Sequence, residues 1–106
     1  MKRSLAALVI VLVAAAGAQA ADVDGKAVYD KQCVKCHGPD GKGDTPAGKA
    51  LKVVPLTDAK WAAADALPKI EAAVRDGIPR MPAMKDKMTA EEITAAAHYV
   101  QTLAKP

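Results

Sequence analysis

The chain has 106 residues, with 15 Lys and Arg against 12 Asp and Glu, a formal net charge of +3. Two of these basic residues, Lys2 and Arg3, lie in an N-terminal segment that continues as a long apolar run. Without them the remaining sequence is nearly neutral, and this balance excludes a nucleic-acid-binding protein. The length fits one small domain, but with no Phe, one Trp and two Tyr the side chains alone make a poor core. We therefore expect a large apolar group to complete that core.

The N-terminus has the three parts of a secretory signal. Two basic residues are followed by the apolar run 5–16 and by an A-x-A cleavage site that ends at Ala20. The run is shorter than the roughly 20 residues of a permanent membrane span. We expect residues 1–20 to be a signal peptide and residues 21–106 to be exported across the inner membrane into the periplasm, with no stable membrane insertion. An uncleaved N-terminal anchor is the alternative.

Residues 22–33 are predicted to form the first helix. Asp22 or Asp24 is suited to cap its N-terminus. Gly25 is unfavourable inside a helix. This glycine either allows a second helix to approach closely, with Tyr29 packing one turn further on, or simply precedes the helix.

A C-x-x-C-H motif follows at residues 33–37, the attachment sequence of a c-type haem. On a helical turn Cys33 and Cys36 lie on one side, with Cβ atoms about 5–6 Å apart, so both thiols reach the two vinyl groups of one porphyrin edge. His37 then lies over the ring face, where its imidazole binds iron. We expect one covalent haem c attached through Cys33 and Cys36, with His37 as an axial ligand of its iron.

Other chemistries also use such cysteines. A thiol–disulfide oxidoreductase would place C-x-x-C in a βαβ unit. A zinc site needs about four ligands, and outside the motif only His98 is a usual one. A structural disulfide is the remaining alternative. The haem is preferred because it also accounts for the small core.

Residues 38–48 are dense in Gly, Pro and Asp, which indicates loops and turns. Residues 49–56 carry apolar side chains but are short and bounded by proline. We expect them to form an extended loop along one edge of the haem, followed by a turn at residues 57–61. Trp61, the sole indole, is predicted to be either a core residue or a hydrogen-bond donor to a haem propionate.

Two further helices are predicted. Residues 65–76 have apolar side chains at helical spacing, and Gly77 stops the helix. Residues 89–104 begin with a capping box at Thr89 and carry one apolar stripe. His98 lies away from that stripe and is predicted to be exposed to solvent.

The loop between these helices supplies candidates for the second iron ligand. Met81 lies between Pro79 and Pro82, each with φ fixed at about −65°, so its thioether is presented by a stiff loop. A thioether is a soft ligand that favours ferrous iron. Met84 and Met88 are the alternatives; we predict that Met84 packs against the ring edge and Met88 at the start of the last helix.

These elements together resemble the class I monohaem cytochromes c of bacteria. The resemblance is carried by C-x-x-C-H with Gly38, by Gly77 with Met81 and its following proline, and by the last helix with its Tyr99-Val100 pair. It covers essentially the whole sequence after residue 20. It implies an all-α cytochrome c fold of three to four helices wrapped around one covalent haem, and the first and last helices should cross near Gly25, Tyr29 and Tyr99.

The same resemblance implies that His37 and Met81 are the two axial iron ligands. In this family the histidine nitrogen that does not bind iron donates to a proline carbonyl, which fixes the ring orientation. Pro46 and Pro55 are both candidates, with Pro46 slightly preferred. Met84 stands where relatives often have an aromatic residue.

We therefore expect a diffusible, monomeric one-electron carrier that shuttles electrons between redox protein partners and is not an enzyme. An iron with both axial positions filled has none left for a substrate. The alternative is a haem-based sensor, ligand-binding or redox-enzyme module with a labile Met81; a non-haem thiol module is a third possibility. Residues 25–61 contain seven lysines and four aspartates, which predicts that acidic partners dock on this part of the surface.

Overall fold

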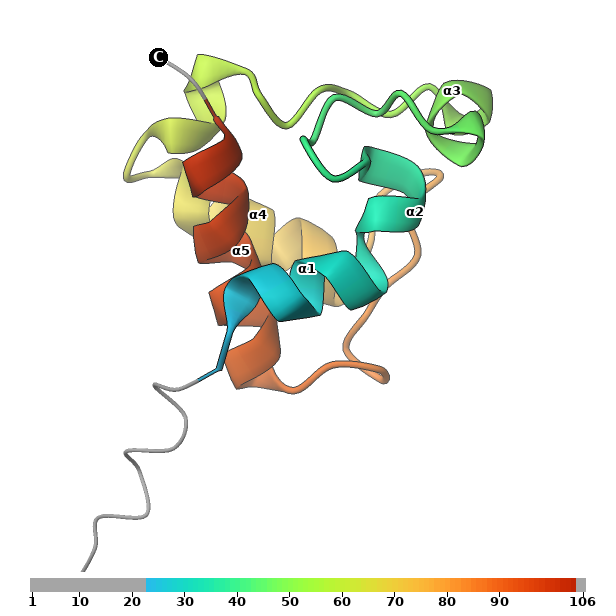
Figure 1. Cartoon of the computed structure of the whole chain (residues 1–106). Coiled ribbons are helices and arrows are strands. Elements are labelled where there is room, and N and C mark those ends of the chain that lie inside the picture. Colours follow the sequence, from blue (N-terminus) through green and yellow to red (C-terminus); the bar gives the residue numbers. More distant parts are fainter. Residues whose placement is uncertain (1–22, 105–106) are drawn as a thin grey trace, which may run out of the picture.

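The computed structural model describes residues 23–104, which form an all-α fold (Figure 1). The predicted fold class is confirmed, and the predicted signal peptide at residues 1–20 lies outside the described residues. No helix within residues 23–104 has the length and apolar character needed to cross a membrane. The elements in chain order are α1 (Gly25–Gln32), α2 (Val34–His37), α3 (Pro46–Leu51), the 3-10 helix η2 (Ala59–Ala62), α4 (Ala66–Asp76) and α5 (Ala90–Leu103).

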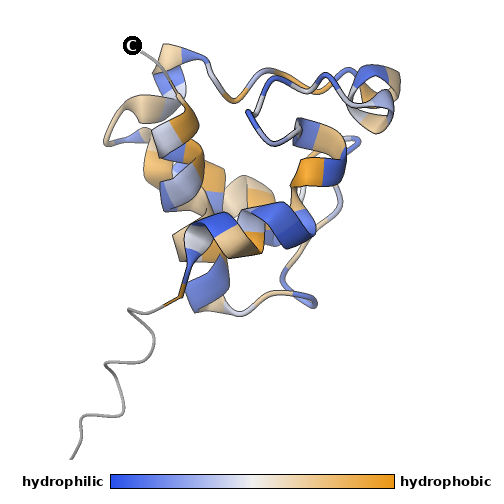
Figure 2. Ribbon diagram, viewed as in Figure 1, coloured by the Kyte–Doolittle hydropathy of each residue, from blue (hydrophilic) through white to orange (hydrophobic). Residues whose placement is uncertain are grey.

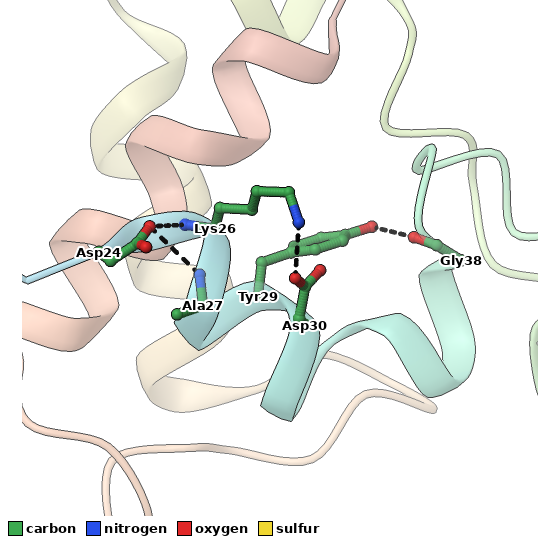
Figure 3. A network of polar contacts seen from close by, with 6 residues as sticks. All are labelled: Asp24, Lys26, Ala27, Tyr29, Asp30 and Gly38. Carbon is green, nitrogen blue, oxygen red and sulfur yellow. Dashed lines mark hydrogen bonds and ion pairs between the residues drawn. The ribbon is translucent and has the colours of Figure 1, made fainter.

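The first helix begins and ends inside its predicted range. Asp24 caps α1, because its carboxylate accepts from the backbone N–H of Lys26 at 3.0 Å and of Ala27 at 3.3 Å (Figure 3). Asp22, the other predicted cap, lies outside the described residues. Gly25 is the first residue of the helix, and a Cβ there would collide with the backbone carbonyl of Ala95 in α5. The close approach of a second helix is therefore confirmed.

The core lies where α5 packs against both α1 and α4 (Figure 1). Tyr29 of α1 is completely buried, and its ring centroid lies 5.1 Å from that of Tyr99 in α5. The predicted crossing of the first and last helices is therefore present. Figure 2 shows hydrophobic and hydrophilic residues alternating around these helices, which is the amphipathic pattern of helices that bury one face. The buried apolar residues of the three helices are Val28, Ala66, Ile70, Val74, Ile93, Ala96, Ala97 and Val100.

The ends of α4 and α5 follow their sequence signals. Gly77 follows α4 with φ of 78°, a backbone conformation that glycine adopts readily. At the start of α5 the Thr89 hydroxyl accepts from the Glu92 N–H at 3.1 Å, while the Glu92 carboxylate accepts from the Thr89 N–H at 2.9 Å. This is the predicted capping box. His98 is exposed, as predicted.

The predicted extended loop at residues 49–56 is partly wrong, because Pro46–Leu51 form the short helix α3. Thr45 caps this helix by accepting from the Gly48 N–H at 2.9 Å, and Pro46 occupies a first-turn position that needs no N–H donor. The glycine and proline content of the region hid this start signal. The helix is followed by Lys52, whose φ is 55°, and residues 53–55 have no regular secondary structure.

Candidate functional site

The C-x-x-C-H motif folds as one tight turn at the end of α1. Cys33 ends α1 and begins α2, and its carbonyl accepts from the N–H groups of Cys36 at 3.2 Å and His37 at 3.0 Å. Both thiols are free and half-buried. The turn therefore brings together the two cysteines and the histidine that the sequence analysis had singled out.

Three consecutive backbone carbonyls at the end of the motif, those of residues 36–38, each have a hydrogen-bond partner. The hydroxyl of Thr45 donates to the first at 3.0 Å, and the N–H of Gly43 donates to the second at 2.8 Å. The third accepts from the buried hydroxyl of Tyr29 at 2.6 Å, as Figure 3 shows, and from the N–H of Gly41 at 3.2 Å. Since these partners come from both sides of the motif, the backbone that carries the histidine is held firmly.

His37 and Met81 line the same cavity, although they are 44 residues apart in the sequence. This main cavity has a volume of about 320 Å³ and an apolar lining that also includes Tyr29, Cys33 and Trp61. A side cavity of about 160 Å³ is lined by His37 and Met81 as well, and it extends to Cys36. The two cavities therefore bring all four predicted haem-binding side chains to one place.

The three candidate methionines occupy different environments. Met81 is half-buried and lines both cavities. Met84 and Met88 are only 8% and 5% exposed, belong to the hydrophobic core and are not among the residues that line either cavity. The predicted position of Met84 against the ring edge is therefore not seen, and Met81 is the methionine that faces the same space as His37.

The loop that carries Met81 is a tight turn. The N–H of Ile78 donates to the Met81 carbonyl at 3.1 Å, and the Met81 N–H donates back to Ile78 at 2.9 Å. The two central residues of the turn are Pro79 and Arg80. Arg80 has a φ of 71°, and a proline followed by a residue with positive φ is the pattern of a type II turn. Gly77 lies so close that a Cβ there would meet the Met81 carbonyl at 2.9 Å. The turn therefore restricts the thioether position more than the prolines alone would.

The residues around the cavities fit a haem. Among the described residues, His37 Nδ1 and Trp61 Nε1 are buried side-chain atoms without a hydrogen-bond partner, so neither Pro46 nor Pro55 accepts from the histidine. Val54 and Ile78 line both cavities, yet each is 53% exposed. A large flat apolar ring with carboxylates on one edge would cover those two side chains and offer the indole an acceptor.

The pKa values at the motif suit metal binding better than thiol exchange. Burial lowers the pKa of His37, which favours the neutral imidazole that binds metals. Burial, with a smaller effect of the neighbouring Cys36, raises the pKa of the Cys33 thiol to about 11. Oxidoreductases need a lowered thiol pKa, so this environment disfavours the thiol module.

The structure adds contacts that the sequence analysis did not predict. Thr45 was a missed helix cap, although Thr followed by Pro is a recognisable start signal. Gln101 of α5 donates from Nε2 to the backbone carbonyls of Trp61 at 3.1 Å and Ala63 at 2.9 Å, for which the sequence carries no signal. His98 lines a shallow groove of about 570 Å³ between α1 and α5, which none of the four predicted haem-binding residues lines.

The chain is similar to known proteins along most of its length. A family model described as cytochrome C oxidase, cbb3-type, subunit III matches residues 20–100. Cytochrome c6 of Microcystis aeruginosa is 34% identical over 82 residues, which cover 77% of this chain and 96% of that protein. The cbb3-type cytochrome c oxidase subunit CcoP of Azospirillum brasilense is 29% identical over 85 residues, or 79% of this chain. The chain spans only 29% of the length of that CcoP.

A solved structure has the same fold. The KustC0563 c-type cytochrome superposes with a TM-score of 0.70 at 33% identity, over 78% of this chain and 100% of that one. The family match, the cytochrome c6 relative and this structure agree with the cavity chemistry. The chain therefore belongs to the c-type cytochromes, in the family described as subunit III of cbb3-type cytochrome c oxidase, and it is an electron carrier with a covalently bound haem c.

Proposed function

We propose that the chain is a periplasmic one-electron carrier whose haem c is attached through Cys33 and Cys36 and whose iron is bound by His37 and Met81. The observation that carries this assignment is the shared cavity, because it brings a half-buried imidazole, whose pKa is lowered by burial, and a thioether to one apolar space beside the C-x-x-C-H turn.

Haem c, when bound, supplies one iron that alternates between the ferrous and ferric states. The chain supplies rigid ligands. The carbonyls of residues 36–38 are hydrogen-bonded on both sides of the motif, and the turn from Ile78 to Met81 is closed by two backbone bonds. Ligands that move little when the iron charge changes keep the reorganisation small, which is what a fast electron carrier needs.

If His37 and Met81 both bound the haem iron, no position on the iron would remain open for a substrate. The proposal therefore favours a carrier over a haem enzyme or sensor. The buried position of Met84 supports the choice of Met81 as the thioether ligand, because Met84 does not line the cavities.

Two residues are proposed to support the haem. Trp61 lines the main cavity, and its buried Nε1 has no partner among the described residues, so we assign it as a donor to a haem propionate. His37 Nδ1 is likewise buried without a hydrogen-bond partner among the described residues. The backbone carbonyl of Pro46 or Pro55 would accept from it after a local shift of the backbone.

The chain exchanges electrons with redox partners, and we propose that these carry acidic surfaces. Lys52 and Arg80 both line the side cavity, both are exposed, and both have a positive φ. They add positive charge beside the cavity that His37 and Met81 share. The signal sequence of residues 1–20 supports a location in the periplasm.

An absorption spectrum of the purified protein tests the proposal. A His/Met-ligated carrier should show sharp reduced bands that carbon monoxide does not change, and a weak long-wavelength sulfur–iron band when oxidised. Bands that shift with carbon monoxide would indicate the sensor or enzyme, and a missing Soret band would indicate a thiol module. An intact mass without one haem adduct, or with the leader retained, would contradict the covalent attachment or the cleavage after Ala20.

A further inference from the structure

Gln101 uses both hydrogens of its side-chain amide on the segment that carries Trp61. Its Nε2 donates to the backbone carbonyl of Trp61 at 3.1 Å and to that of Ala63 at 2.9 Å. An amide NH2 group has two donors, so each carbonyl receives one. These bonds fasten η2 and the residue that follows it to α5, the helix at the centre of the core.

The other hydrogen bonds of the η2 segment are local: the Asp58 carboxylate accepts from the Lys60 N–H at 3.0 Å, and the Ala63 carbonyl accepts from the Ala66 N–H at 3.0 Å. The segment is a single turn of 3-10 helix, a short element with weak hydrogen-bond geometry. Within it the Trp61 N–H donates to the Asp58 carbonyl at 3.1 Å. Among the hydrogen bonds of the described residues, those of Gln101 are the ones that join this segment to α5 and so relate Trp61 to the core.

Within residues 23–104, the indole of Trp61 combines an unpartnered polar atom with a cation beside its ring. Trp61 Nε1 is buried without a partner among the described residues and belongs to a residue that lines the main cavity. The ammonium of Lys60 lies 4.9 Å from the centroid of the Trp61 ring. Lys69, which also lines the cavity, has its ammonium 3.8 Å from the carboxylate of Asp65. An N–H donor without a partner in the described part of the chain, with the Lys60 ammonium beside its ring, favours a carboxylate as the acceptor, while Lys69 already has Asp65 as its partner.

We propose that Gln101 is a positioning residue, which holds Trp61 so that the indole N–H is directed at a carboxylate of the bound haem. This inference rests on the proposed haem site. Gln101 does not touch the haem; it acts through the backbone of η2. Without its amide, the turn moves more freely and the indole N–H is no longer kept on its acceptor. The carboxylate then keeps more of its negative charge, which stabilises ferric iron and lowers the midpoint potential.

Trp61 is the sole tryptophan, so the ¹⁵N-labelled, reduced holoprotein has a single indole N–H signal to follow. The test variant is Gln101→Met, which keeps an unbranched side chain of similar length but has no donor. The matched control is Thr102→Ala, which removes a donor to the Tyr99 carbonyl from the next residue of α5. Gln101→Arg retains N–H donors and serves as the rescue.

In Gln101→Met, hydrogen exchange of the indole proton should become at least tenfold faster and the midpoint potential should fall. Thr102→Ala should change neither, and Gln101→Arg should restore slow exchange. Trp61→Phe should also lower the potential, and adding Gln101→Met to it should lower the potential no further, because both changes remove the same hydrogen bond.

Unchanged exchange and potential in a folded Gln101→Met would overturn the inference, and so would an equal fall in potential when Trp61 is Phe. Should Gln101→Met not fold, Gln101→Glu, which has the same shape without the donors, replaces it under the same criteria. A sulfur–iron band in the unmutated protein separates these failures from failure of the proposed function, since that band depends on Met81 and not on Gln101.

Discussion

The hydroxyl of Tyr29 donates a 2.6 Å hydrogen bond to the backbone carbonyl of Gly38 (Figure 3). The same ring lies 5.1 Å from Tyr99 at the crossing of α1 and α5. One side chain therefore connects the helix crossing to the residue directly after His37, so the packing of the fold and the placement of the iron ligand depend on each other.

Tyr29→Phe should lower the free energy of unfolding by about 0.5–1.5 kcal/mol, because it removes the shorter of the two hydrogen bonds to the buried Gly38 carbonyl and leaves only the bond from the Gly41 N–H at 3.2 Å. Guanidinium unfolding of the haem-loaded protein measures this loss. Tyr99→Phe is the control, since it preserves the ring pair and the Tyr29 bond and should cost less. Equal losses in the two variants would show that the Gly38 bond contributes nothing specific.

Alkaline solution should destabilise the protein partly through Tyr29, whose pKa is raised chiefly by burial. An unfolded tyrosine loses its proton at about pH 10, while the folded one keeps it to higher pH. The stability that this residue contributes is complete below that pH and is lost as the pH rises further, with a slope of up to about 1.4 kcal/mol per pH unit. Between about pH 9 and 11 the free energy of unfolding should fall less steeply with pH in Tyr29→Phe than in the unmutated protein. An unchanged slope would count against this origin.

Gly25→Ala should also destabilise the fold, because the added Cβ would collide with the Ala95 carbonyl in α5. The helices must move apart, at a cost of about 1–3 kcal/mol. Ala27→Ser, on an exposed part of the same helix, should leave stability nearly unchanged. Thermal unfolding of both variants tests the prediction, and a Gly25→Ala protein as stable as the parent would show that the crossing tolerates a wider separation.

Met81→Ala should abolish the sulfur–iron band, lower the potential and allow carbon monoxide to bind the reduced form, since the soft ligand is lost. Met84→Ala should keep the band and the potential but lower stability by about 2–5 kcal/mol, because this side chain is buried in the core. Oxidised spectra and carbon monoxide titrations of the two variants distinguish the roles. Loss of the band in Met84→Ala alone would mean that the ligand is assigned to the wrong methionine.

Electron transfer with an acidic redox protein should slow as the salt concentration rises, because screening weakens attraction to the lysine-rich residues 25–61. Lys52→Gln, next to the side cavity, should slow the reaction at low salt more than Lys26→Gln does, since Lys26 is already paired with Asp30 at 2.8 Å. Stopped-flow rates over a range of ionic strengths measure both effects. Rates that do not depend on salt would argue against electrostatic docking.

Elements with strong local signals were predictable from the sequence. The capping box at Thr89, the stop at Gly77 and the C-x-x-C-H turn each depend on residues a few positions apart, and the structure has all three. The helix after Thr45 was missed, because its short length and the surrounding glycines gave no apolar period to detect.

Contacts between distant segments were harder to predict. The Gly25–Ala95 approach was anticipated only because glycine is costly in a helix, and nothing in the sequence pointed from Gln101 to Trp61, 40 positions earlier. A single side-chain amide that binds two backbone carbonyls leaves no periodic pattern, so only the folded chain reveals it.

The four donors to the carbonyls of residues 36–38 belong to Tyr29, Gly41, Gly43 and Thr45, so all of them lie between residues 29 and 45. Because a chain is made from its N-terminus, every group that shapes the cysteine turn has been synthesised long before Met81 and α5. The backbone of the turn that holds both cysteines and His37 is therefore shaped by contacts local in the sequence, whereas the candidate thioether comes from a separate loop more than 40 residues further along the chain.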